Sequence, residues 1–391
     1  MVLPVRSAVE TPPPAGGGAT TPAPAELPPD ARILAVKLAD IGDLLTATPA
    51  LRSLRLRYPL GRLDVLTTPH AARALPAVLA DHVLTAPRNL ASSPADLPRL
   101  AQLLVQLRRG RYHAVAFFHH LTLASGVAKY RLLAAATAAP VRAGLDNGKG
   151  RWLTHAAPDL GFGARHEVAY GLAVAERLGA MPPPDLRLAA AANPAGLEPL
   201  AAELEPLAGR PLVAVHPGSG GYALARRWEP TKWAAVADAL ADRYGAAILL
   251  VGTPADGAEQ VAAAMARPAL NLAGRTDLPT LAALLARCAL FLGADSGVMH
   301  LAAAMGVPVV ALFGPSNHLA WGPWAPSSPA TVVRLGLSCS PCSYVGHAVG
   351  RRNGCWHRSC MADLEPDRVL AAVEGLGVLE PVRTEGSPAA S

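Results

Sequence analysis

The chain alternates between short apolar runs and longer segments in which apolar residues recur at helical spacing. Apolar runs of this length predict buried strands, and the longer segments predict helices. In the first half, the predicted strands cover residues 33–37, 63–67, 114–118 and 141–143, and the predicted helices cover residues 44–58, 96–109, 125–135 and 166–178. Strands that alternate with helices predict a parallel sheet with helices on both of its faces.

The same alternation returns after a stretch punctuated by proline, from Met181 to Pro211. Here the predicted strands cover residues 212–215, 248–251, 270–272, 289–292 and 309–313, and the predicted helices cover residues 230–244, 256–265, 277–286 and a segment after Asp295. The predicted fold class is therefore α/β, with two Rossmann-like doubly wound domains that face each other across a cleft. Sheets of this kind bind ligands outside the carboxyl ends of their strands.

Composition predicts where the domains begin and end. A length of 391 residues is too great for one ordinary core. Residues 1–30 are rich in Pro, Ala, Gly and Thr without periodicity, so we expect disorder, and no continuous apolar stretch follows Arg6 to mark a secretory signal. The expected divisions are an N-terminal domain at 31–185, a linker at 186–210, a C-terminal domain at 211–376 and a loose tail at 377–391.

One polar turn stands out between a predicted strand and a predicted helix, at Asp295, Ser296 and Gly297. The first N–H groups of a helix have no partner inside it, and their partial positive charge favours a phosphate. Gly297 lets backbone approach such a ligand closely, and Asp295 or Ser296 can cap the helix or hold a ribose hydroxyl. The alternative is a capped turn that binds nothing, because the chain has no P-loop or G-x-G-x-x-G signature.

Two further strands end in turns of the same design. The sequence HPGS at 216–219 follows one strand, and Arg226 and Arg227 shortly after it can offer guanidinium groups to a diphosphate. The sequence ADIGD at 39–43 follows the first strand and opens the first helix.

In their order and spacing, these turns resemble glycosyltransferase family 9, the bacterial ADP-heptose:lipopolysaccharide heptosyltransferases. The matching segments are Gly42-Asp43 with TPAL at 48–51, HPG at 216–218, RRW at 226–228, AGRT at 273–276 and DSGVMH at 295–300. Each motif is loose alone, and the specificity comes from their order along residues 32–372. The resemblance implies the GT-B fold and an inverting, metal-independent glycosyltransferase. The expected reaction moves heptose from ADP-heptose to a hydroxyl of a cell-envelope glycan or glycolipid.

The resemblance also implies roles for individual residues. Asp43 occupies the family's catalytic position as general base; helix capping is an alternative role compatible with catalysis, and Asp40 is a weaker candidate base. Arg226 replaces the family's phosphate-binding Lys, and side chains and helix N-termini neutralise the diphosphate, so catalysis needs no cofactor. The expected donor-binding residues are Gly42, His216, Gly218, Ser219, Arg226, Arg227, Thr276, Asp295, Ser296, Gly297, Val298, Met299 and His300.

Two other functions fit the same architecture. A nucleotide-sugar epimerase would need further carboxylates or histidines in the cleft, and the sequence shows no convincing set. A non-catalytic nucleotide-sugar-binding protein would have no use for Asp43 beside two phosphate turns. His300 has its own alternative, as a core or capping residue.

The distribution of charged residues indicates which partners the chain could bind. Residues 31–150 contain 16 Lys and Arg against 6 Asp and Glu, although the whole chain is only +6. This excess is either a solvated basic face or a surface for an anionic glycolipid or glycan acceptor, or for the inner membrane surface. No nucleic-acid-binding module is recognised, so we do not expect a nucleic-acid partner. No apolar stretch is long enough to span a membrane. We therefore expect a cytoplasmic protein that is at most peripheral to the inner face of the cytoplasmic membrane.

Four cysteines lie close together near the C-terminus, at Cys339, Cys342, Cys355 and Cys360. Thiolates at this spacing can hold a structural zinc. An iron–sulfur cluster and two disulfides are the alternatives, and the cytosol disfavours disulfides.

Overall fold

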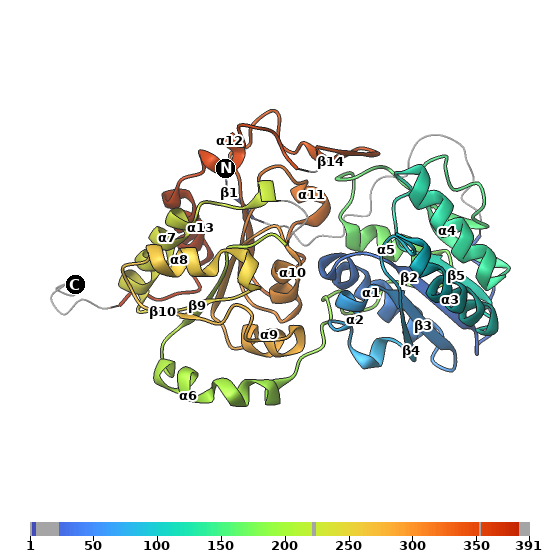
Figure 1. The fold of residues 1–391 in the computed structure, drawn as a ribbon, viewed down its shortest axis with the longest axis horizontal. Helices are drawn as coiled ribbons and strands as arrows, with labels where there is room; N and C mark the ends of the chain where they lie inside the picture. The colour runs from blue at the N-terminus through green and yellow to red at the C-terminus, as the bar shows by residue number, and fades with distance from the viewer. Residues whose placement is uncertain (1, 5–22, 221–223, 352, 383–391) are drawn as a thin grey trace.

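The computed structural model describes residues 2–4, 23–220, 224–351 and 353–382. The described residues form two domains, each built on one sheet with helices on both faces (Figure 1). The predicted α/β fold class is confirmed.

The N-terminal sheet is entirely parallel, with the strand order β4-β3-β2-β5-β6-β7. Its strands are β2 (Arg32–Lys37), β3 (Arg62–Thr67), β4 (His82–Thr85), β5 (Ala114–Phe117), β6 (Val141–Asp146) and β7 (His155–Pro158). Its helices are α1 (Ile41–Arg57), α2 (Pro69–Ala72), α3 (Leu97–Arg109), α4 (Ala124–Thr137) and α5 (Glu167–Glu176). The two strands that the sequence did not predict, β4 and β7, lie at the sheet edges, where few residues are buried and the apolar signal is weak.

The helices divide between the two faces of this sheet because strand side chains alternate in direction. Ile33 and Ala35 of β2 belong to the core beneath α1 and α5, whereas Leu34 and Val36 belong to the core beneath α3 and α4. The carboxyl ends of all six strands therefore lie at one edge of the domain.

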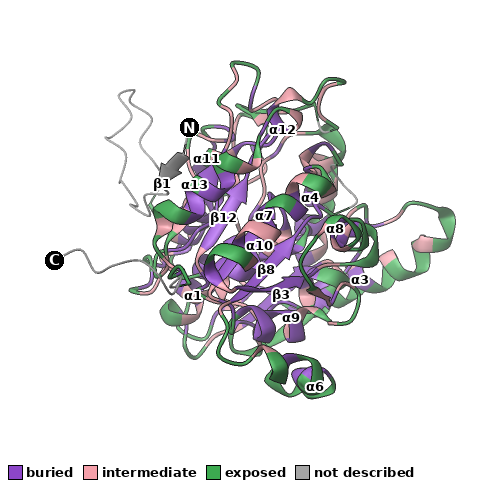
Figure 2. Cartoon of the chain, turned by 90° about the vertical axis from the view of Figure 1, so that its left-hand side faces the viewer, coloured by how far each residue is buried: buried purple, intermediate pink, exposed green. Residues whose placement is uncertain are grey.

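The C-terminal sheet has the order β1-β13-β12-β11-β8-β9-β10, and only β1 is antiparallel. The parallel strands are β8 (Leu212–His216), β9 (Ala247–Leu250), β10 (Ala269–Asn271), β11 (Leu290–Ala294), β12 (Val309–Leu312) and β13 (Ala330–Val333). The helices are α7 (Pro230–Tyr244), α8 (Ala258–Ala264), α9 (Leu278–Leu285), α10 (Gly297–Ala304), α11 (His318–Trp321), α12 (Ser359–Ala362) and α13 (Pro366–Leu376). Figure 2 shows that the central strands β8 and β12 are buried, as expected for a parallel sheet covered on both faces.

Two expectations about the ends and the linker need correction. Most of the segment expected to be disordered lies outside the described residues, but β1 (Val2–Pro4) pairs with β13, and buried Ala25 donates its N–H to the Arg177 carbonyl. The linker contains a 3-10 helix (Pro194–Leu200) and α6 (Ala201–Leu204), whose leucines are buried. Burial of apolar side chains orders segments that composition alone marks as loose. Most of the expected tail, residues 383–391, lies outside the described residues, but Leu379 is buried.

The two domains meet where the N-terminal ends of α1 and α10 approach each other. A Cβ atom on Gly42 would lie 2.6 Å from Cδ2 of His300, and a Cβ atom on Gly297 would lie 3.2 Å from Cβ of Ile41. A side chain at Gly42 would therefore clash with His300, and one at Gly297 would be crowded against Ile41 of the other domain. Both helices point their N-termini into the space between the two sheets.

A second contact between the domains comes from the cysteine-rich segment. Its hairpin, β14 (Ser343–Val345) and β15 (Ala348–Gly350), turns at Gly346, whose carbonyl accepts a 2.7 Å hydrogen bond from the Phe162 N–H group. The Phe162 ring also packs against Trp321 and Tyr344. The hairpin thus reaches from the C-terminal domain onto the N-terminal one.

Candidate active site

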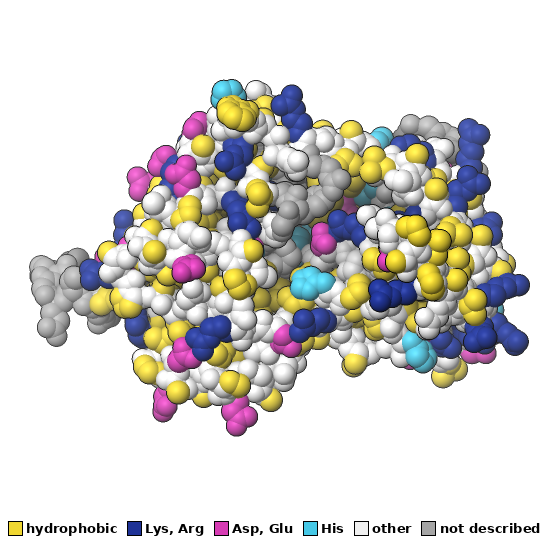
Figure 3. Space-filling view, in the orientation of Figure 1, with side chains coloured by type: hydrophobic (Ala, Val, Ile, Leu, Met, Phe, Trp, Pro, Cys, Tyr) yellow, Lys and Arg dark blue, Asp and Glu magenta, His cyan; other side chains and the backbone are white. Residues whose placement is uncertain are grey.

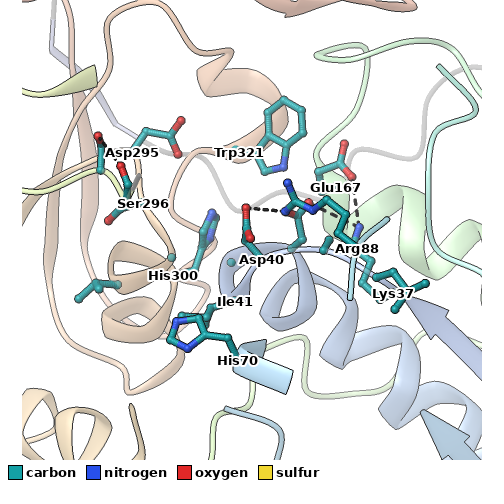
Figure 4. Close-up of a pocket in the computed structure, with 18 of the residues that line it drawn as sticks. Lys37, Asp40, Ile41, His70, Arg88, Glu167, Asp295, Ser296, His300 and Trp321 are labelled. Atoms are coloured by element: carbon teal, nitrogen blue, oxygen red, sulfur yellow. Dashed lines mark hydrogen bonds and ion pairs between the residues drawn. The ribbon is translucent and has the colours of Figure 1, made fainter. Parts of the chain in front are cut away.

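A cavity of about 1380 Å³ lies between the domains, lined by residues at the carboxyl ends of strands from both sheets. In Figure 4, Asp295 and Ser296 lie on the side of the C-terminal domain, and Lys37, Asp40, Arg88 and Glu167 lie on the other. The loops that follow parallel strands form the site, as the predicted fold requires.

On the wall from the C-terminal domain, Arg226 and Asp295 form an ion pair. The distance from Nη1 of Arg226 to Oδ2 of Asp295 is 3.0 Å, and both side chains are largely buried. The sequence pointed to these residues separately, and the structure brings them together at the end of β11. A guanidinium has five N–H donors, so this pair holds the group in place and leaves donors for an anionic ligand.

Ser296 caps helix α10. Its Oγ accepts a hydrogen bond from the Met299 N–H group at 3.3 Å and lies 3.2 Å from Nδ1 of His216. The N–H groups of Gly297 and Val298 precede the first bonds within the helix and border the cavity. Met299 was predicted to bind the donor, but its side chain is fully buried in the core and its N–H is used by the cap.

Asp256 also lines the cavity on the side of the C-terminal domain, and the sequence motifs did not point to it. Its carboxylate accepts hydrogen bonds from the N–H and hydroxyl of Thr253 and lies 3.5 Å from Nε2 of His216 and 3.4 Å from Nη2 of Arg227. Burial alone would raise the pKa of Asp256, but the bonds from His216 and Thr253 outweigh it and hold that pKa far below its ordinary value. The Thr253-x-x-Asp256 spacing is a capping box and is the signal that could have revealed it.

Gly218 packs against Asp256. A Cβ atom at Gly218 would lie 2.1 Å from Oδ1 of Asp256, and Gly218 does not line the cavity. Ser219, Thr276 and Arg227 do line it, as predicted.

His300 lies at the seam between the domains and borders the cavity. Its side chain is buried, its Nδ1 has no hydrogen-bond partner among the described residues, and burial lowers its pKa to about 3. The imidazole is therefore neutral at physiological pH. It can exchange a hydrogen bond with a ligand, and it cannot act as a cation.

Asp43 lies in the first turn of α1, on the wall from the N-terminal domain. Its side chain is 31% exposed, and Oδ1 is 3.7 Å from Nζ of Lys37. Burial raises the pKa of Asp43; Lys37 opposes this effect, whereas Asp40 and Glu167 add to it. The residue at the N-cap is Asp40, which makes no capping bond, so the structure gives Asp43 no capping role and leaves its carboxylate facing the cavity.

Asp40 is a poorer candidate for the base because it is already paired. Its Oδ2 lies 2.6 Å from Nη2 of Arg88, and Figure 4 shows this ion pair beside the cavity.

Behind Asp43 lies a chain of buried ionised groups that the sequence analysis did not find. Lys37 donates to the Phe118 carbonyl at 2.8 Å and lies 4.0 Å from Oε2 of Glu167. His120 bridges Glu167 and Asp159, with one ring nitrogen 2.9 Å from each carboxylate. Burial would lower the pKa of His120, but the two carboxylates raise it to about 9, so the ring is an imidazolium at neutral pH. Lys37 is the last residue of β2, and His120 follows β5. Their position at the carboxyl ends of these strands was the signal in the sequence that could have revealed them.

The four cysteines of the C-terminal segment have free thiols. Burial raises the pKa of Cys360 to about 11, and the other three cysteines add to the rise. Across residues 2–4, 23–220, 224–351 and 353–382, no three His, Cys, Asp or Glu side chains are arranged to hold a metal ion. The structural zinc at these four cysteines stays a prediction. In the same described ranges, no helix has both the length and the apolar character that a membrane span needs.

Comparison with known proteins places this site in a family. A sequence model of glycosyltransferase family 9 (heptosyltransferase) matches residues 102–350. Lipooligosaccharide heptosyltransferase 2 of Campylobacter jejuni is 30% identical over 43% of this chain, and the matched part spans about half (51%) of that relative. Lipopolysaccharide heptosyltransferase 2 of Salmonella typhimurium is 27% identical over 88% of this chain and 98% of its own length.

Solved structures show the same fold. A family 9 glycosyltransferase from Veillonella parvula superposes with a TM-score of 0.69 at 22% identity, covering 88% of this chain and 97% of its own. The ADP-heptose lipopolysaccharide heptosyltransferase II of Escherichia coli superposes with a TM-score of 0.63 at 23% identity, covering 88% and 98%. The shared fold is the GT-B arrangement of two Rossmann-like domains.

Proposed function

The chain belongs to glycosyltransferase family 9, and from this premise we propose that it is an inverting glycosyltransferase that uses a nucleotide-diphosphate sugar. The donor is ADP-heptose, and the acceptor is a hydroxyl group of a glycolipid of the lipopolysaccharide type. One observation carries the proposal: Asp43 on the N-terminal domain and the Arg226–Asp295 turn on the C-terminal domain line the same cavity. The names of the Campylobacter, Salmonella and Escherichia relatives support the choice of sugar and acceptor.

The C-terminal wall holds the donor in this proposal. The N-terminal end of α10 receives the diphosphate, and the Arg226 guanidinium neutralises part of its charge. Neutral His300 and the hydroxyl of Thr276 offer hydrogen bonds to the rest of the nucleotide sugar. Protein charges and helix dipoles that are already in position stabilise the leaving diphosphate.

The N-terminal wall supplies the base. The acceptor oxygen attacks the anomeric carbon while its proton moves to the Asp43 carboxylate, and the bond from the anomeric carbon to the diphosphate oxygen breaks. ADP leaves with the bonding electrons, and attack from the opposite face inverts the anomeric centre. The raised pKa of Asp43 makes its carboxylate a stronger base, and the nearby Lys37 favours its ionised form. A nucleotide-sugar donor places the proposed reaction in the cytoplasm.

A donor panel tests the proposal. The full chain is incubated with ADP-heptose, ADP-glucose, UDP-N-acetylglucosamine or GDP-mannose and a heptose-deficient lipooligosaccharide, and the products are analysed by mass spectrometry. The proposal expects acceptor extended by one heptose, with release of ADP. A sugar changed without transfer would indicate an epimerase, and tight binding without any turnover would indicate a binding protein.

The structural zinc at Cys339, Cys342, Cys355 and Cys360 stays a separate prediction and has no part in the chemical step. Elemental analysis of protein purified under reducing conditions tests it. One zinc per chain would support the site, with removal by a chelator lowering the melting temperature before the initial rate. Folded protein without bound metal would leave these residues as free thiols.

A further inference from the structure

Helix α3 presents an apolar stripe to solvent on the N-terminal domain. Leu103 and Leu107 are the residues that it buries, whereas Leu97 and Val105 are 56% and 50% exposed. Leu97, Ala101 and Val105 are spaced by four residues and share one face of the helix, and all three are exposed. A helix on the surface of a soluble domain normally carries polar residues on that face.

Helix α4, which packs beside α3, repeats this pattern. It buries Tyr130 and Leu133 against the sheet, and its exposed face carries Ala128, Leu132 and Ala135. Leu132 is 41% exposed. The six apolar residues at 97, 101, 105, 128, 132 and 135 are called the α3–α4 surface below. In Figure 3, hydrophobic side chains gather over these helices with Lys and Arg around them.

The charges on and around the α3–α4 surface are mostly positive, and the acidic residue beside it is Asp96, at the N-cap of α3. Residues 97–145 contain seven Lys and Arg and no Asp or Glu. Arg108 lies on the same side of α3 as the apolar stripe, Arg131 lies beside Leu132 on α4, and both are exposed. Elsewhere in the domain, arginines such as Arg55 and Arg62 are paired with aspartates.

The α3–α4 surface is continuous with the cleft through α4. The first turns of this helix, at Ser125, Gly126 and Lys129, line the cavity on the side of Asp43. Leu123, just before the helix, also lines the cavity and is 54% exposed. A molecule that lies against the α3–α4 surface is therefore next to the acceptor side of the site.

We propose that the α3–α4 surface docks on an anionic lipid bilayer, with its leucine and valine side chains at the level of the headgroups and its arginines on lipid phosphates. Apolar area combined with positive charge is what binds a helix face to such an interface. The docking delivers a lipid-anchored acceptor into the cleft along α4. This delivery rests on the proposed function, whereas the docking itself does not.

Charge and apolar area together favour lipid over the other anionic partners. A nucleic acid would meet cations and polar groups, and it would gain nothing from an alanine and leucine face in the centre of the surface. A second copy of this chain would bring exposed arginines of the same surface, such as Arg108 and Arg131, against one another. A bilayer with anionic headgroups satisfies both the apolar centre and the basic margin.

Vesicle flotation tests the docking with the full chain, without donor or acceptor. The vesicles are phosphatidylethanolamine with phosphatidylglycerol, and phosphatidylcholine alone is the neutral comparison. We expect binding to the anionic vesicles that weakens as salt is raised. The variant Val105→Asp/Leu132→Asp should reduce binding at least about tenfold, and Arg108→Gln/Arg131→Gln by about fivefold for each charge removed.

Matched controls keep the outcome clear. Leu60 and Val78 are more exposed than Val105 and Leu132, at 79% and 78%, and lie on other elements of the same domain. Leu60→Asp/Val78→Asp should bind vesicles like the native chain, and all variants should keep the native melting temperature and affinity for ADP. Native binding by the Asp variant, or no binding to anionic vesicles by the native chain, would overturn the proposal. Two other results would also overturn it. One is that the Asp variant loses a dimer seen by light scattering but binds vesicles like the native chain. The other is that the chain binds duplex DNA as tightly as it binds vesicles, whether or not Leu132 is replaced. Failure of sugar transfer would leave the vesicle result unaffected.

Discussion

The two walls of the cleft hold their charges in different ways. On the C-terminal wall, each cation meets one carboxylate: Arg226 pairs with Asp295, and Arg227 with Asp256. On the N-terminal wall, Asp43 stands at the end of a buried chain that runs through Lys37, Glu167 and His120 to Asp159. Fixed cations beside a helix N-terminus suit the binding of a diphosphate, whereas a buried chain of charges sets the basicity of one carboxylate. The two tasks are therefore assigned to different domains and should respond separately to mutation.

The largest expected effect falls on the N-terminal wall. Asp43→Asn keeps the size of the side chain and removes the basic oxygen, so kcat should fall by about 10²–10⁴-fold, the usual range for loss of a general base. Calorimetry should show unchanged affinity for ADP. Asp40→Asn is the matched control, because Asp40 is paired with Arg88, and it should lower kcat far less. A reversed order of the two variants would move the base to Asp40.

The buried chain should also make stability depend on pH. The folded-state pKa of His120 is about 9, above its ordinary value, so its stabilisation is complete below about pH 6.5 and is lost as pH rises through about 9. The shift corresponds to stabilisation on the order of 3 kcal/mol. Thermal unfolding between pH 6 and 9.5 measures it. The native chain should lose stability across this range, and His120→Gln, less stable at pH 6, should show a flatter profile. Parallel profiles would remove the imidazolium from the core.

On the C-terminal wall, the effect should appear in binding. A charged hydrogen bond to a phosphate contributes about 1.5–3 kcal/mol, so Arg226→Ala should weaken ADP binding by about ten- to a hundredfold. Some stability should be lost as well, because the variant leaves the Asp295 carboxylate largely buried and unpaired. Arg226→Lys restores the charge and should recover most of the affinity. If calorimetry gives equal dissociation constants for all three proteins, Arg226 does not contact the nucleotide.

The smallest expected effect comes from replacing Lys37, and it tests whether Lys37 controls the ionisation of Asp43. Lys37→Met removes the cation that favours ionised Asp43, so the pKa of Asp43 should rise further. Because the reaction needs the ionised base, kcat should fall more at acidic pH than at alkaline pH. The rate profile of the variant against pH measures this shift. A uniform loss at every pH would indicate a structural role only.

The sequence revealed the C-terminal wall better than the N-terminal one, for a physical reason. The turn at Asp295 and the arginines at 226 and 227 lie in continuous motifs, where a strand, a turn and a helix start follow one another. Lys37, His120, Asp159 and Glu167 come from separate segments and meet only when the sheet forms. No local pattern contains their contacts.

Where local motifs misled, tertiary packing decided the outcome. Met299 lies within a binding motif, yet helical periodicity turns its side chain into the core. Gly218 was predicted to bind the donor, and in the structure it leaves room for Asp256, 38 residues later in the chain. Most of the parallel strands and both domains followed from periodicity, because burial on two faces leaves a strong apolar signal. The sequence did not predict the parallel strand β13, although most of its residues are buried. The strands at the edges of the N-terminal sheet lack that signal.

The separation of the two walls can be measured directly with a double-mutant cycle. Values of kcat/KM for ADP-heptose are determined for the native chain, Asp43→Asn, Arg226→Ala and the double variant. If the base and the diphosphate clamp act independently, the two losses multiply, and the double variant agrees with their product within about twofold. A double variant no slower than Asp43→Asn alone would show that the two residues act as one unit and would contradict the division of labour between the domains.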